Sequence, residues 1–113
     1  MKLKFLFSGL FFLFANEPSF SANMDGNTLY SWCSIDNDKT AALRCTVYVD
    51  GVFEGIQWSE VSNQQKPSFC PPANSNLRQY VDIVVLWLKK NPGSRTIPAA
   101  AVVQSALAEV FPC

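Results

Sequence analysis

The sequence predicts an all-α fold, a small bundle of about four helices stapled by two disulfides. Apolar residues recur at helical spacing in several segments, and prolines and asparagines separate those segments from one another. The chain has 113 residues and four cysteines, and small secreted domains commonly supplement a small core with disulfides. A chain of this length is expected to form one domain.

The first 21 residues have the pattern of a secretory signal peptide. Lys2 and Lys4 precede an apolar stretch over residues 5–15, and small residues, Ser19 and Ser21, occupy the −3 and −1 positions if cleavage follows Ser21. The stretch is shorter than the roughly 20 apolar residues of a membrane span, although a short retained anchor is the alternative. We therefore expect a mature domain of residues 22–113, a periplasmic location and no stable membrane anchor after cleavage.

Two helices are expected in the first half of the mature chain. Residues 24–33 form the first candidate, with Asp25 or Asn27 able to cap it. Residues 39–60 form the second, and the Asn-Asp pair at 37–38 can break the chain and cap this helix. Its apolar residues follow the helical period.

The second segment also carries a competing signal for a β-hairpin. Residues 46–49 are rich in β-formers, and Asp50-Gly51 between apolar runs is a strong hairpin turn. If the segment is a helix, Gly51 and Gly55 each cost about 1 kcal/mol relative to alanine. Their four-residue spacing is then explained by another helix that approaches closely at that face.

A third and a fourth helix are expected after a polar loop at residues 62–68. The third covers residues 76–90, with Asn74 or Ser75 as its cap, and is apolar almost all round. Part of it therefore either faces a second subunit or leaves Tyr80 and Trp87 partly exposed on a monomer.

The fourth helix is expected around the regular apolar stripe of residues 99–111. Ser94 or Thr96 can cap it, and Pro98 is expected in its first turn. Pro112 ends it.

The cysteines are expected to form two structural bridges. If the third and fourth helices form an antiparallel hairpin, Cys70 and Cys113 become neighbours, which leaves Cys33 and Cys45 on either side of the first turn between helices. Four cysteines allow three connectivities, so this pairing is a hypothesis.

Composition excludes several classes of function. The sequence has no histidine, so the usual Ser-His, Cys-His and histidine–metal sites are absent. Nine basic and nine acidic side chains give no net charge, which disfavours nucleic acid as a partner. We expect no cofactor and no metal site, and an enzyme is the least favoured class.

Motifs spread over residues 29–113 resemble the Rap/Tai family of type VI secretion amidase immunity proteins. The resembling positions are Cys45, Tyr48, Gly51-Val52, Phe69-Cys70-Pro71-Pro72, the run Gln79 to Val85, Leu88, Asn91-Pro92, Arg95, Pro98-Ala99, Ala106-Leu107 and Phe111-Pro112-Cys113. The resemblance implies an all-helical fold, often a homodimer, that binds a peptidoglycan amidase effector in the periplasm and obstructs its active-site cleft. It also implies a helix rather than a hairpin at Asp50-Gly51.

Two polar segments are the candidate partner-binding sites, since a braced, protruding loop loses little entropy on binding. The candidate residues are Trp58, Glu60, Asn63 and Gln64 after the second helix, and Lys90, Asn91, Ser94 and Arg95 between the third and fourth. Trp58 and Arg95 are of the types enriched in interface hot spots. In both segments the alternative is an ordinary solvated connection.

A small periplasmic helical chaperone or stress-response binding protein is the alternative function. An acid-switched chaperone should be rich in titrating carboxylates. Without Lys2, Lys4 and Glu17 the mature chain has seven basic and only eight acidic side chains, so its charge favours the immunity protein.

Overall fold

The computed structural model describes residues 24–113, and the expected signal peptide lies outside the described residues. The α-helices are α1 (Gly26–Cys33), α2 (Lys39–Ser62), α3 (Leu77–Lys90) and α4 (Ala99–Val110), and a 3-10 turn, η1 (Pro92–Ser94), precedes α4. Within residues 24–113 the only β-type pairing is an isolated bridge between Asp25 and Pro98. The predicted all-α fold is confirmed.

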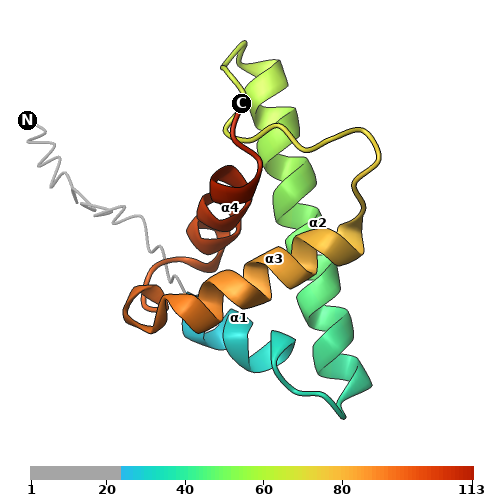
Figure 1. The fold of residues 1–113 in the computed structure, drawn as a ribbon, viewed down its shortest axis with the longest axis vertical. Helices are drawn as coiled ribbons and strands as arrows, with labels where there is room; N and C mark the ends of the chain where they lie inside the picture. Colours follow the sequence, from blue (N-terminus) through green and yellow to red (C-terminus); the bar gives the residue numbers. More distant parts are fainter. Residues whose placement is uncertain (1–23) are drawn as a thin grey trace, which may run out of the picture.

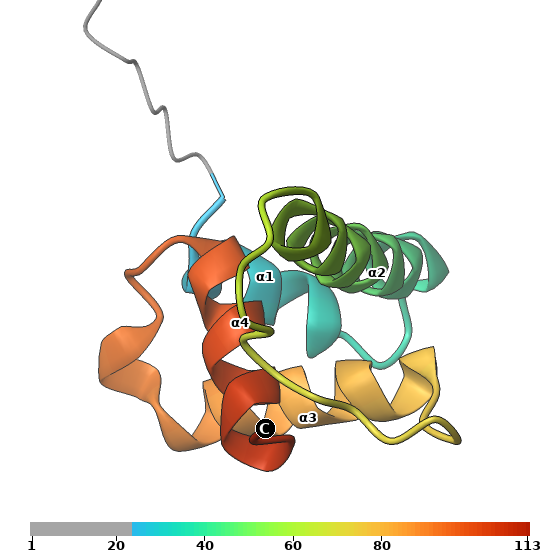
Figure 2. The same ribbon diagram turned by 90° about the horizontal axis from the view of Figure 1, so that it is seen from above.

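The four α-helices form one packed body in which each contacts the other three. Figure 1 shows α3 crossing α2 at a steep angle, with α1 and α4 on either side of α3. In the view from above, α2 and α3 lie along opposite sides of the molecule (Figure 2). This arrangement leaves one long face of α2 free of other helices.

Aspartates begin the first two helices. The Asp25 carboxylate accepts from the Thr28 backbone N–H at 2.8 Å, and Asp38 accepts from the N–H groups of Thr40 and Ala41. The hairpin alternative for residues 46–51 is wrong, because α2 runs without a break to Ser62.

The explanation expected for the glycines of α2 is also wrong. A Cβ built on Gly51 or Gly55 meets no atom within 4 Å, so no helix of this chain approaches there. Both residues lie on the exposed face of α2.

The caps of the last two helices differ from those expected. Asn76, rather than Asn74 or Ser75, caps α3, and Gln79 completes a capping box with it. Neither Ser94 nor Thr96 caps α4: Pro98 occupies the cap position without a side-chain hydrogen bond. The Ala99 N–H instead donates to the backbone carbonyl of Met24 at 2.9 Å.

That bond belongs to a backbone pairing between the start of α1 and the segment before α4. The N–H of Gly26 donates to the Ile97 carbonyl at 3.0 Å, and the N–H of Asn27 donates to the Arg95 carbonyl at 2.8 Å. The two segments lie so close that a Cβ on Gly26 would sit 2.8 Å from the Arg95 oxygen. Gly26 is therefore required by the close approach of two backbones.

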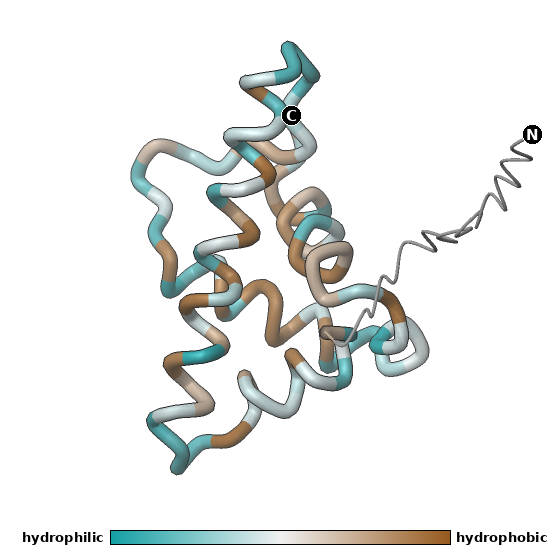
Figure 3. The backbone as a smooth tube through the Cα atoms, turned by 180° about the vertical axis from the view of Figure 1, so that it is seen from behind, coloured by the Kyte–Doolittle hydropathy of each residue, from teal (hydrophilic) through white to brown (hydrophobic). Residues whose placement is uncertain are grey.

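One hydrophobic core draws on every α-helix. Its buried members are Leu29, Val49, Phe69, Tyr80, Val84, Leu88, Ala99, Val102, Val103, Ala106 and Leu107. Hydrophobic and hydrophilic positions alternate along the helices in Figure 3, as expected where one face of each is buried.

An aromatic cluster ties the long connection between α2 and α3 to this core. Phe53 stacks on Tyr80 with ring centroids 4.5 Å apart, and Phe69 lies 5.5 Å from Phe53. Phe111 meets Tyr80 edge-on at 6.1 Å. Tyr80 is thus buried, contrary to the monomer alternative that left it partly exposed, whereas Trp87 is half-buried.

The predicted disulfide pairing is confirmed. Cys33 is joined to Cys45 across the connection between α1 and α2, and Cys70 is joined to Cys113. The second bridge closes the end of the chain against the segment before α3.

Candidate functional site

The carboxyl end of α2 projects from the body of the molecule and carries the most exposed aromatic side chain described. Trp58 is 74% exposed and Val61 is 71% exposed. These two apolar residues lie one turn apart on the solvent side of the helix. Trp58 therefore occupies the kind of position that the sequence predicts for partner binding.

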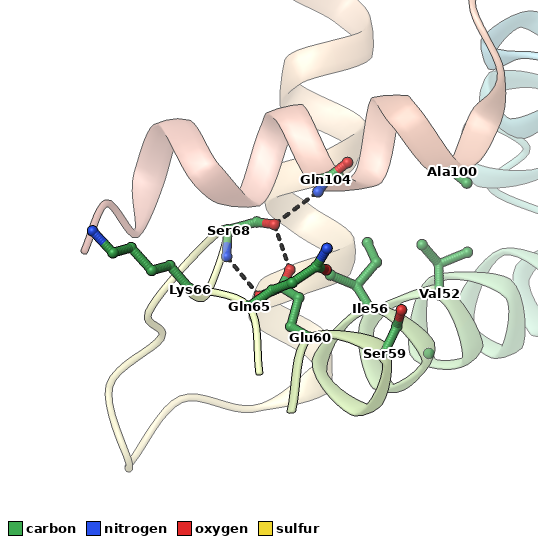
Figure 4. Close-up of a pocket in the computed structure, with 10 residues that line it drawn as sticks. Val52, Ile56, Ser59, Glu60, Gln65, Lys66, Ser68, Ala100 and Gln104 are labelled. Carbon is green, nitrogen blue, oxygen red and sulfur yellow. Dashed lines mark hydrogen bonds between the residues drawn. The ribbon is translucent and has the colours of Figure 1, made fainter. Parts of the chain in front are cut away.

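Glu60 lies between them in sequence but points inward. Its side chain is buried, and its carboxylate accepts from the Ser68 backbone N–H at 2.8 Å and from the Ser68 hydroxyl. The side-chain amide of Gln104 on α4 donates to the same hydroxyl oxygen at 2.8 Å. Figure 4 shows this chain of hydrogen bonds from α2 through the connecting segment to α4.

The network borders a cleft of about 620 Å³ between α2 and α4. Val52 and Ile56 of α2 and Ala100 of α4 form its apolar part, and Glu60, Gln65, Ser68 and Gln104 are among its polar residues. A second hollow of about 470 Å³, lined by Val61, Pro67 and Phe69 among others, also reaches Glu60.

The end of α2 is held in shape by further local bonds. The Asn63 side chain donates to the Ser59 carbonyl at 2.8 Å, and Gln64 adopts a left-handed backbone with φ of 54°. The N–H of Gln65 then returns to the Glu60 carbonyl at 2.8 Å. The segment after α2 is therefore exposed but ordered by its own hydrogen bonds.

The second candidate segment, residues 90–96, forms a tight turn around η1. Lys90 is exposed at the end of α3, and the Asn91 side chain donates to the Trp87 carbonyl at 2.9 Å. The Ser94 N–H donates to the Asn91 carbonyl at 3.0 Å. This turn, like the segment after α2, is held by hydrogen bonds within itself and to α3.

Arg95 is engaged within the fold. Its Nε donates to the Leu88 carbonyl at 2.8 Å, and its guanidinium carbon lies 3.8 Å from the ring centroid of Tyr30. This cation–π contact joins α1 to the segment before α4. The guanidinium is thus half-buried and has intramolecular partners.

The two candidate segments lie at different places on the molecule. In Figure 1 the tip of α2 is at the top, whereas the turn around η1 lies at the lower left. The eight candidate residues therefore form two separate surfaces.

Sequence reasoning missed the cleft and an apolar patch at the opposite end of α2. The patch comprises Trp32, Leu43, Arg44, Val47 and Tyr48. Leu43 and Val47 are more than half exposed, and their four-residue spacing was the available signal. The cleft had no local signal, because Ser68 and Gln104 are brought to Glu60 only by the tertiary fold.

Residues 24–113 hold no group of acidic or cysteine side chains arranged to bind a metal ion. None of their helices is long and apolar enough to cross a membrane.

The sequence matches a known protein family. The model of the Rap1a immunity proteins matches residues 25–113, which is nearly all of the described chain. Comparisons with curated proteins and with solved structures gave no match. A family match over this length includes all four helices and both disulfides, and the chain therefore belongs to the Rap1a immunity protein family.

Proposed function

We propose that this protein is a periplasmic immunity protein that binds a secreted peptidoglycan amidase and blocks its active-site cleft. Membership of an immunity protein family carries the proposal. Two further features support the compartment: the signal-peptide pattern of residues 1–21, and two disulfides, which persist in oxidising compartments.

The tip of α2 is the surface that we propose for the effector. Trp58 and Val61 offer exposed apolar area, and Asn63 and Gln64 add polar groups in a segment already fixed by hydrogen bonds. A prearranged surface loses little conformational entropy on binding. Lys90, Asn91 and Ser94 form a second, smaller contact surface in this proposal.

The direct test of the function is an inhibition assay. The mature protein, added to a peptidoglycan hydrolase captured with it from periplasm, should suppress amide-bond cleavage in purified peptidoglycan at stoichiometric concentration. Hydrolysis that continues unchanged with every captured hydrolase would overturn the proposal.

The surface is tested with Trp58→Ala. We expect affinity for the effector, measured by calorimetry, to fall by at least about thirtyfold, because a truncated tryptophan hot spot costs about 2 kcal/mol or more. Leu43→Ala is the matched control, since Leu43 is also exposed on α2 but lies toward its other end. Equal affinities of the two variants would place the interface elsewhere.

We also propose a homodimer through α3 and α4. Leu86 and Val110 are 52% and 51% exposed, and they border a shallow hollow with half-buried Ile83 and Trp87. A charged residue there should separate the subunits, so Leu86→Glu should sediment as a monomer where the native protein sediments as a dimer. A native protein that sediments as a monomer at high concentration would contradict this part.

A further inference from the structure

Glu60 is a buried carboxylate that accepts hydrogen bonds from Ser68 but has no cation beside it among residues 24–113. Its side chain is 9% exposed, and glutamate is rarely buried to this degree unless it is paired. Within residues 24–113 the ion pair found is between Arg78 and Asp82, both exposed, and no lysine or arginine lies within pairing distance of Glu60.

The groups that donate hydrogen bonds to the Glu60 carboxylate are uncharged, and they do not use all of the sites at which its oxygens can accept. Ser68 supplies both donors, its backbone N–H and its hydroxyl. An ionised carboxylate can accept at about four lone-pair sites. About half of these sites are therefore free to accept from a further donor. Lys66 lines the same cleft, but its side chain points away from the carboxylate (Figure 4).

The cleft next to this carboxylate has the composition of a receptor for a long cationic side chain. Val52, Ile56 and Ala100 offer apolar surface to an aliphatic stem, and Gln65 and Gln104 bring amide groups near the carboxylate. The volume of about 620 Å³ lies within the usual range for a ligand site, about 300–1,000 Å³.

We propose that the cleft between α2 and α4 receives an arginine side chain of the partner protein, whose guanidinium pairs with Glu60. Charge complementarity points to a cation. Arginine fits better than lysine because its planar guanidinium carries five donors and is less strongly hydrated than an ammonium. This inference rests on the proposed function only for the identity of the protein that carries the arginine.

Arginine binding can be measured without the effector. N-acetyl-arginine amide, titrated into the ¹⁵N-labelled protein at low salt, should cause saturable shifts of the Ser68 and Gln65 backbone amides and of the Gln104 side-chain amide. The neutral analogue N-acetyl-norleucine amide should cause none. Shifts that do not saturate, or that scatter over the surface, would overturn the proposal.

The charge of Glu60 is tested with Glu60→Gln, in which the amide oxygen still accepts from the Ser68 N–H. We expect at least tenfold weaker binding of the arginine probe. Glu54→Gln is the matched control, because Glu54 is exposed on the same helix and loses the same charge. Equal probe affinity in both variants would refute the role of Glu60.

Two readouts keep the test decisive. If Glu60→Gln does not fold, the native protein still tests the proposal. Nuclear Overhauser contacts should then appear between the methylenes of the arginine probe and the methyl groups of Val52 and Ile56. Their absence would show that the probe does not bind in the cleft. If the probe binds there but no hydrolase is inhibited, the proposed function fails while the arginine site stands.

Discussion

Gly26 shows how one residue sets the path of the chain at the start of the domain. Its N–H bonds to Ile97, and the place of its missing side chain is filled by the backbone of Arg95. The neighbouring contact of Arg95 with Tyr30 draws the same two segments together. Sequence reasoning proposed Arg95 for a partner surface because it lies in a braced loop and arginine is enriched in interface hot spots. Its contact with Tyr30 had no local signal, since Tyr30 lies far away along the chain.

Gly26→Ala should destabilise the domain by about 1–3 kcal/mol, the usual cost of overpacking. The added Cβ would lie within 3 Å of two backbone atoms of Arg95, which cannot rotate away. Urea unfolding followed by circular dichroism measures the change. Gly93→Ala is the control, because a Cβ there meets nothing within 4 Å; equal stabilities of the two variants would contradict the close approach.

Asp25 should make stability depend on pH in the acid range. Hydrogen bonds from the Thr28 backbone N–H and hydroxyl lower its pKa below the usual 3.8. Because the folded pKa is the lower one, this contribution is present above about pH 4 and is lost as the pH falls through the folded pKa. The stability difference between the native protein and Asp25→Asn should therefore shrink from pH 5 to pH 2 in urea titrations.

At the scale of elements, α2 is the helix that the sequence described least completely. Its apolar period indicated a helix, while Asp50-Gly51 indicated a turn, and the tertiary contacts of Val49 and Phe53 decide for the helix. Capping was predictable at Asp25 and Asp38, whereas at α3 the sequence indicated Asn74 or Ser75 and the capping box of Asn76 and Gln79 was missed. It was not predictable at α4, where the Met24 carbonyl, from a distant segment, satisfies the first N–H.

Gly51→Ala should stabilise the protein by about 0.5–1 kcal/mol, because alanine restricts the unfolded chain and favours the helix. The new methyl group enters open space. A higher midpoint in urea, with an unchanged slope, is the expected result. A lower midpoint would show that the exposed face of α2 is covered in solution, as in an assembly.

At the scale of the molecule, the disulfides hold together a domain of modest core. Two bridges were expected from the four cysteines, whereas their pairing was one of three connectivities and was proposed only from an assumed hairpin of the last two helices. The cleft was not, because Glu60, Ser68 and Gln104 meet only after all of α2 and α4 are in place. From the sequence, Glu60 was therefore expected to be a polar residue on an exposed segment, whereas the structure buries its side chain.

The bridge between Cys70 and Cys113 should contribute the larger share of stability. It closes a loop with a sequence separation of 43, against 12 for Cys33 and Cys45. Loop-closure entropy alone gives about 4 kcal/mol for the first and about 3 kcal/mol for the second. The double variants Cys70→Ala/Cys113→Ala and Cys33→Ala/Cys45→Ala, compared by thermal unfolding, measure both. A smaller loss for the longer loop would show that strain or packing outweighs entropy.

The order of the bridges also matters for how the chain is made. Each bridge joins a cysteine to the next one along the sequence, so the two loops neither overlap nor enclose each other. If the protein is exported amino end first, as proposed above, Cys33 and Cys45 emerge together before Cys70. An oxidase that joins thiols in order of arrival would then produce the native pairing directly, without reshuffling by an isomerase.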